Sequence, residues 1–171
     1  MTTEISSTHL RGIVDALGKS VGYGQALLAD VDPDDFAHMP SARFNHPAFN
    51  YGHLALYPNR CLEMVGRADA VVELPFETEH YEQTAECLEQ DGRYASMEVL
   101  TGAFDASHAR LLEVLPEIDP ECFSADLPEG RYRDFFGTVG NAVTFITCSH
   151  PMMHLGQVSM WRRAMGLGSC M

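Results

Sequence analysis

Two histidines four residues apart give the strongest chemical signal in this sequence. They are His150 and His154, the first and last residues of the segment HPMMH. In an α-helix, residues at i and i+4 lie on the same face, about one turn apart. Both imidazoles can then be directed at one ion that lies about 2.0–2.1 Å from each ligating nitrogen. His53, on another segment with helical periodicity, occupies a similar inward position, so three imidazoles from two helices can converge on one point.

A simpler interpretation competes with this one. A single inward-facing histidine is more often a hydrogen-bonded core residue than a metal ligand. However, buried polar groups need partners, and two imidazoles one turn apart on an apolar face have no obvious shared partner. The spacing of His150 and His154 alone leaves both interpretations open, and the third inward histidine, His53, favours metal binding.

Three neutral histidines leave one coordination position of a tetrahedral ion open, which is typical of catalytic rather than structural sites. Such a position can hold a water whose pKa falls to about 7, or a thiol held as thiolate. Imidazole suits zinc, nickel, copper and iron. The HExxH pattern of zincins is absent because Pro151 stands where the glutamate would be. No carboxylate is placed by the pattern as a general base.

Three polar residues near the histidines are candidates for orienting them. Asn50 and Tyr57 flank His53 at i−3 and i+4, and Gln157 follows His154 by three residues. Residues that hydrogen-bond a ligating histidine usually fix its orientation, although ordinary surface or core polar residues explain the same positions. Cys148 stands at i−2 from His150 and points to another side of the helix, so it is left out of the site.

Four segments with a period of three to four residues must position these side chains. We predict helices over 6–30, 47–67, 96–117 and 134–165. The last carries the stripe Val139, Val143, Ile146, His150, His154, Val158, Trp161 and Met165. Four amphipathic helices bury their stripes against each other, which predicts an all-α four-helix bundle as one domain over residues 1–171. The long connection 68–95 permits helices two and three to run parallel, joined by a crossover.

Prolines and caps refine the expected helix boundaries. Pro47 suits a first helical turn, with Asn45 as its cap, and Ser96 caps the third helix. Pro58 and Pro151 fall inside the helices that carry the histidines. An interior proline kinks a helix, so we hypothesise that the two kinks open a pocket over the metal. The alternative is that one proline marks a helix end.

Composition excludes several classes of protein. The chain has 171 residues and a net charge of −13, which disfavours nucleic-acid binding because phosphates are repelled. Its five cysteines form no CxxC pair, so neither a disulfide scaffold nor a cysteine zinc site is expected, and a reducing cytoplasm fits. No apolar run approaches the roughly 20 residues that span a membrane, and the first 20 residues contain no signal-peptide pattern.

Two segments resemble the DinB/YfiT-like superfamily of metalloenzymes. They are HPAFNYGHLALYPNRCLEMVG around His53 and SHPMMHLGQVSMWRRAMGL around His150 and His154. The GHLA turn and the H-x-x-x-H-x-G-Q run, followed by arginine and glycine, are specific when found together. Pro151 inside the HxxxH turn is a departure. Motif-grade similarity covers these two segments, whereas helix order is similar over the whole chain.

This resemblance implies an up-down-down-up four-helix bundle, often a homodimer, with one divalent ion on His53, His150 and His154. Zinc or nickel is the ion that it favours. It also implies a small-molecule substrate and either a metal-dependent hydrolase or a transferase or isomerase that uses a low-molecular-weight thiol. A metal-binding or structural bundle without catalysis remains the alternative.

Overall fold

The protein is all-helical. We describe residues 2–170 of a computed structural model, with side chains from residue 8 onward. Within that range no strand forms, and one isolated bridge pairs Asp126 with Thr138. None of the helices described is long and apolar enough to cross a membrane.

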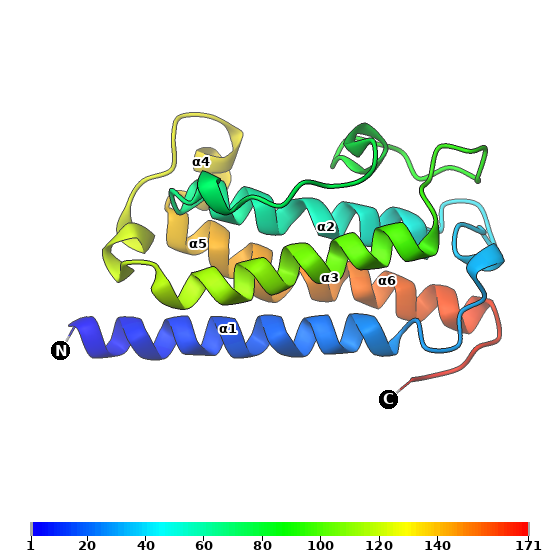
Figure 1. Cartoon of the computed structure of the whole chain (residues 1–171), viewed down its shortest axis with the longest axis horizontal. Coiled ribbons are helices and arrows are strands. Elements are labelled where there is room, and N and C mark those ends of the chain that lie inside the picture. The colour runs from blue at the N-terminus through cyan, green and yellow to red at the C-terminus, as the bar shows by residue number, and fades with distance from the viewer. Residues whose placement is uncertain (1, 171) are drawn as a thin grey trace.

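Long helices that lie side by side form the body of the molecule (Figure 1). They are α1 (Thr2–Ala26), α2 (Pro47–Met64), α3 (Met97–Val114) and α6 (His150–Ala164). Two short helices, α4 (Arg131–Phe136) and α5 (Val139–Thr144), and a π-helical turn, Phe145–Ser149, lead into α6. The connections contain 3₁₀ turns at Pro33–Asp35, Ala68–Ala70, Thr78–Tyr81, Leu115–Glu117 and Pro120–Ser124.

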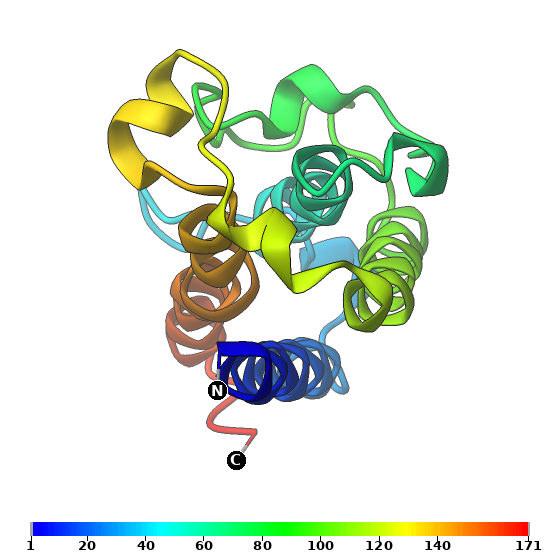
Figure 2. The same ribbon diagram turned by 90° about the vertical axis from the view of Figure 1, so that its left-hand side faces the viewer.

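The central helix is α2. Every residue from Pro47 to Pro58 is buried, because α3, α6 and the 3₁₀ turn at Thr78–Tyr81 pack around it. Seen end-on in Figure 2, the connection between α2 and α3 passes over the outside of α2. A helix covered on all sides can carry polar groups only if each has a partner. The histidine and asparagine side chains of α2 therefore require defined hydrogen bonds.

The predicted helices agree with the structure for the first three segments, apart from ends that differ by a few residues. The fourth prediction, one helix over 134–165, is wrong at its start. Gly137 adopts a φ of 75° between α4 and α5, a left-handed conformation that ends a helix. Thr138 then caps α5 by accepting a hydrogen bond from the Asn141 N–H. Residues 131–136 therefore form the separate helix α4.

The expected caps are half right. Ser96 caps α3 by accepting the Val99 N–H, as predicted. The cap of α2 is not Asn45 but His46, whose Nδ1 accepts the Phe49 N–H at 3.1 Å, and Pro47 stands in the first turn as expected. An imidazole nitrogen performs here the task of a serine or asparagine oxygen.

The two prolines do not act alike. α2 continues through Pro58 to Met64. Pro151 lies in the first turn of α6, directly after the π-helical turn, in which the His150 N–H bonds to the Phe145 carbonyl five residues back. Helical residues run without a break from Val139 to Ala164, so Pro151 does not mark a helix end, and the π-helical turn directly before it changes the hydrogen-bond pattern where the proline N–H is missing. The hypothesis that kinks at both prolines open a pocket stays a prediction.

Candidate metal centre

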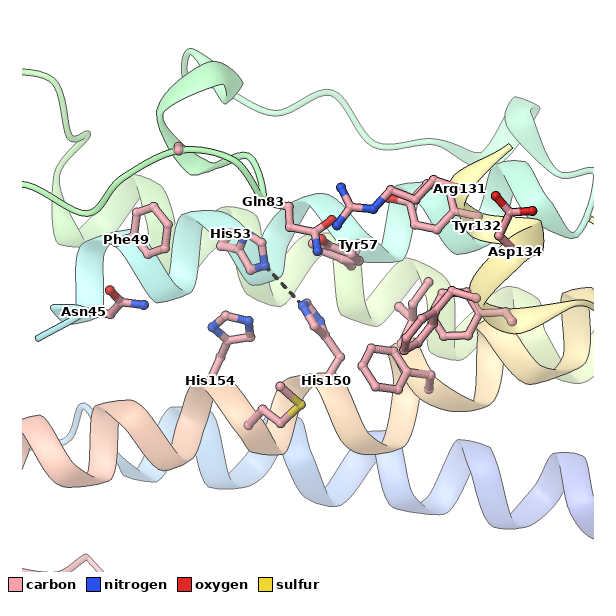
Figure 3. Close-up of a pocket in the computed structure, with 16 residues that line it drawn as sticks. Asn45, Phe49, His53, Tyr57, Gln83, Arg131, Tyr132, Asp134, His150 and His154 are labelled. Atoms are coloured by element: carbon pink, nitrogen blue, oxygen red, sulfur yellow. Dashed lines mark hydrogen bonds between the residues drawn. The ribbon is translucent and has the colours of Figure 1, made fainter. Parts of the chain in front are cut away.

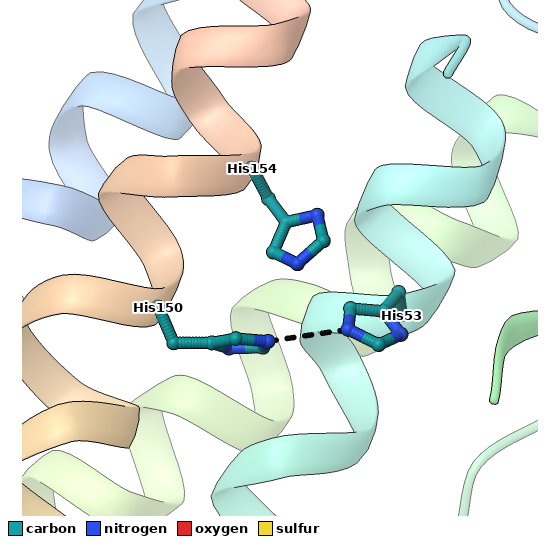
Figure 4. A group of neighbouring side chains, drawn as sticks. All are labelled: His53, His150 and His154. Atoms are coloured by element: carbon teal, nitrogen blue, oxygen red, sulfur yellow. Dashed lines mark hydrogen bonds between the residues drawn. The ribbon is translucent and has the colours of Figure 1, made fainter. Parts of the chain in front are cut away.

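Three histidine side chains meet between α2 and α6. Each of His53, His150 and His154 offers one ring nitrogen, and these nitrogens lie within 4.8 Å of one another. The Nε2 atoms of His53 and His150 are 3.2 Å apart. Figures 3 and 4 show His53 reaching from α2 toward the other two rings, which project from successive turns of α6. His53 and His150 are buried and His154 is half-buried.

The tautomer of His53 is fixed by a backbone carbonyl. Its Nδ1 lies 2.6 Å from the Tyr81 carbonyl oxygen. Since a carbonyl only accepts, Nδ1 of His53 must carry the proton, and Nε2 of the neutral ring is left with a lone pair. That lone pair faces His150.

A neighbouring glycine allows this contact. A Cβ at Gly52 would lie 2.1 Å from the Tyr81 ring, so only glycine lets Tyr81 pack against α2 at this point. The Tyr81 hydroxyl is also anchored, by the Ala95 N–H at 2.9 Å. The 3₁₀ turn that carries Tyr81 is thereby held where its carbonyl reaches His53.

Asn50 fixes the tautomer of His154 in the same way. The Nδ2 atom of Asn50 donates to the carbonyls of Asn45 and His46, at 3.2 and 3.3 Å. Its Oδ1 is therefore the atom that faces His154, and it accepts from Nδ1 at 2.9 Å. His154 is left with an Nε2 lone pair, as His53 is. Asn50 is itself fully buried.

His150 has no such partner. Its Nδ1 is buried and makes no hydrogen bond to any residue that the structure describes. Its Nε2 faces the lone pair of His53, so either a proton or a cation must lie between the two nitrogens. Two nitrogens on a tetrahedral zinc ion are about 3.3 Å apart, given about 2.05 Å for each bond. The observed 3.2 Å between the Nε2 atoms fits that value.

Burial keeps all three rings neutral. It is the largest cause of the lowered pKa of His53, and it lowers the pKa of His150 to about 2 and that of His154 to about 3. The neighbouring histidines lower the pKa of His150 further, whereas a hydrogen bond to the Gln157 side chain partly opposes the lowering of the His154 pKa. Neutral imidazole is the form that binds a metal. The cluster is therefore compatible with holding a metal ion.

One sequence family matches the part of the chain that carries the three histidines. Residues 24–158 match the sequence model of the DinB superfamily, a stretch that covers most of the chain and includes all three histidines. The chain belongs to the DinB superfamily. No curated protein and no solved structure matches it.

This DinB superfamily member has a pocket of about 560 Å³ beside the histidines. That size lies within the usual range for small-molecule sites. Its apolar wall includes Phe49, Phe135, Phe136, Phe145, Ile146 and Met153, and its charged lining residues are Arg131 and Asp134. All three histidines line it, so whatever they hold is open to a ligand.

The other residues singled out in the sequence take different places in this DinB protein. The Tyr57 ring lies against His150, with centroids 4.0 Å apart, and lines the pocket. Gln157 is exposed, and its Oε1 accepts a hydrogen bond from Asn45 at 3.1 Å. A histidine outside the cluster and not considered in the sequence analysis, His108, is a core residue whose Nδ1 bonds the Phe104 carbonyl. Cys148 does not belong to the histidine cluster.

Several residues escaped sequence reasoning. Tyr81 contributes through its backbone, which no side-chain pattern reveals, although the glycine directly before His53 was a usable signal of a close approach. Gln83 and Arg131 come to the pocket from connections between long helices. Their neighbours in the sequence show no periodicity that would have placed them there.

Proposed function

We propose that this protein is an enzyme that holds one divalent metal ion, zinc or nickel, on His53, His150 and His154. The observation that carries the proposal is the convergence of three neutral imidazoles on one point at the wall of a pocket. Hydrogen bonds that the histidines donate to the Tyr81 carbonyl and to Oδ1 of Asn50 orient two of the rings, as partners of ligating histidines usually do. The lone pair on Nε2 of His53 lies 3.2 Å from Nε2 of His150, and a cation between the two nitrogens would satisfy both.

The reaction class follows from what the pocket supplies. Three histidine ligands leave a coordination position at which an ion can lower the pKa of a water or a thiol. The proposed activities are therefore a hydrolase or a low-molecular-weight-thiol-dependent transferase or isomerase acting on a small molecule. Asp134 is the carboxyl group that lines the pocket, and it points away from the histidines in Figure 3. The lining residues thus place no carboxylate base beside them.

The access that the pocket gives a ligand to the three histidines favours a catalytic role over a structural one. Structural zinc sites are closed by four protein ligands, whereas catalytic sites keep a position open. The three histidines have no fourth histidine, cysteine or carboxylate in their cluster within the described chain, and they border a pocket. A metal-binding bundle without catalysis is the alternative outcome of the experiment below.

Metal analysis of purified protein tests the metal site. We expect about one ion per chain in the wild type after metal-replete purification. Each of His53→Ala, His150→Ala and His154→Ala should lose most of it. His38→Ala, at an exposed histidine outside the cluster, is the matched control and should keep its metal. Wild-type protein without stoichiometric metal would contradict the proposal.

Substrate panels then separate enzyme from binder. Metal-loaded protein is tested on esters, amides and thiol adducts, with His150→Ala as the control for contaminating activity. Turnover that disappears in that variant supports an enzyme. Stoichiometric metal without any turnover across the panel supports a binding bundle.

We further propose that the helices form an up-down-down-up four-helix bundle with a crossover between α2 and α3. Figure 1 supports this: the chain colour runs one way along α1 and α6 and the other way along α2 and α3. The connection between Met64 and Met97 is long enough for such a crossover.

A homodimer in a reducing compartment completes the proposal. Exposed methionines on α6 (Met152, Met153 and Met160) form apolar surface of the kind that protein contacts bury. All five cysteines are free thiols, which suits a reducing cytoplasm. Sedimentation equilibrium tests the dimer: a monomeric mass at all concentrations would contradict it.

A further inference from the structure

One cation in the pocket has no partner. Arg131 lines it and makes no ion pair or side-chain hydrogen bond with any described residue. Two nearby arginines differ: Arg60 pairs with Glu82, and Arg133 pairs with Asp126 at 3.1 Å. The chain carries a net charge of −13, so acidic partners are abundant. A guanidinium left free beside a pocket is available for a ligand.

The direction of the Arg131 side chain fits that use. In Figure 3 the guanidinium extends from α4 toward Gln83 and the histidines. Asp134, on the same short helix, turns its carboxylate away from them. No ion pair joins the two residues. The charge that faces the interior of the pocket is therefore positive.

An aromatic wall connects this cation to the histidines. Phe136 contacts Phe145 with ring centroids 5.2 Å apart, and Phe145 in turn lies 6.0 Å from the His150 ring. Phe135 packs on Phe136 and is 74% exposed. A ligand that covers this wall buries apolar area and touches both the cation and the histidines.

We infer that the pocket selects a small molecule with an apolar, aromatic-sized body and a carboxylate, the carboxylate held by Arg131 and the reacting group directed to the histidines. This inference rests on the proposed function for the role of the histidines, and it assigns Arg131 as the residue that determines specificity. The planar fork of arginine matches a carboxylate with two parallel hydrogen bonds. A single guanidinium with an acidic neighbour suits a monoanion better than a dianionic phosphate.

Binding of matched probes tests the assignment. Isothermal titration calorimetry compares 4-phenylbutyrate with the neutral 4-phenylbutyramide and with 3-phenylpropyl phosphate, on wild-type protein. We expect the carboxylate to bind at least about tenfold more tightly than the amide, the size expected for hydrogen bonds between charged groups. Arg131→Gln should remove this preference, and Arg131→Lys should keep part of it.

Arg133→Gln is the matched control. It removes a positive charge two residues away, from an arginine that does not line the pocket, and should leave the preference intact. Because Arg131 has no partner to lose, its variants should keep the thermal midpoint of the wild type.

Repeating the titrations on chelator-treated protein separates this inference from the metal site. A preference that depends on Arg131 with or without metal supports the inference even if no metal is found. A preference that survives Arg131→Gln and disappears with the chelator places the carboxylate on the metal and overturns it. Failure of both 4-phenylbutyrate and 4-phenylbutyramide to bind at millimolar concentration, or tighter binding of 3-phenylpropyl phosphate, also overturns the carboxylate assignment.

Discussion

The Nδ1 atom of His154 lies 2.9 Å from the Oδ1 atom of Asn50, and this bond joins α6 to α2 at the histidine cluster. Asn50 holds its amide in place with two backbone carbonyls at the start of α2. The direction of a half-buried ring on one helix is thus determined by the first turn of another. The packing of α2 against α6 and the orientation of the proposed metal-binding histidines therefore cannot change independently.

Removing this bond should weaken metal binding. We expect Asn50→Leu to lower metal affinity about 10–100-fold, because partners that orient ligating histidines have effects of this size. A competition titration against a chromophoric chelator measures it. Asn59→Ala is the control: it breaks two bonds to the Val72 backbone from the same helix, and should lower stability without changing metal affinity. Equal affinities in Asn50→Leu and wild type would show that Asn50 has no orienting role.

A methyl group at Gly52 should damage both fold and site. The new Cβ would overlap the Tyr81 ring, and overpacking of a core typically costs about 1–3 kcal/mol. The displaced Tyr81 carbonyl would also release His53. We expect Gly52→Ala to unfold at lower urea concentration and to bind metal more weakly.

Two further variants test whether the cause is this overlap. Adding Tyr81→Ala to Gly52→Ala removes the ring that is struck, so the double variant should be destabilised by less than the sum of the single changes. Gly102→Ala, at an exposed helical position with open space, should stabilise the protein by up to about 1 kcal/mol. Additive destabilisation in the double variant would count against the explanation.

Metal removal should lower the thermal midpoint. An ion at one hundred times its dissociation constant adds about 2.7 kcal/mol to folding, which corresponds to roughly 5–10 °C for a chain of this size. Differential scanning fluorimetry with and without a chelator measures the shift. His150→Ala should show no such dependence on the chelator. A wild type that melts at the same temperature in both conditions would rule out a site that is stabilising and occupied.

His108 should make stability depend on pH. Burial lowers its pKa from 6.5 to about 4, so between these values the unfolded chain binds more protons than the folded one. Stability is therefore complete above pH 6.5 and falls as the pH drops toward 4, by at most about 3 kcal/mol. His108→Leu should make stability, measured by urea denaturation, depend less on pH in this window. Parallel curves for His108→Leu and wild type would contradict the assignment.

The sequence predicted the parts of the site that depend on helical periodicity. His53, His150 and His154 lie on apolar stripes, and a stripe determines which side of a helix faces the core. Their meeting at one point follows from that. Membership of the DinB superfamily was likewise predicted from the GHLA and HxxxH segments and is confirmed.

Features of the site that do not depend on helical periodicity were not predicted. The bond from His53 to the Tyr81 carbonyl depends on the path of a connection that has no regular pattern. Arg131 lies on the six-residue helix α4. The prediction left the first three residues of α4 outside any helix and merged the rest with the next helix, because Gly137 was not interpreted as a break. The helices that carry the three histidines were predictable. The residues that orient the histidine rings and line the pocket come partly from irregular segments and were not.

The π-helical turn at Phe145–Ser149 gives α5 and α6 different angular phases. One residue more than an α-helical turn requires is accommodated there, and each residue of an α-helix corresponds to about 100° of rotation. Deleting a single residue in this turn would leave composition and hydrophobicity almost unchanged, yet it would swing His150 and His154 about a quarter-turn out of alignment with α5. Loss of the site among relatives can therefore arise from a change in chain length alone, with every histidine still present.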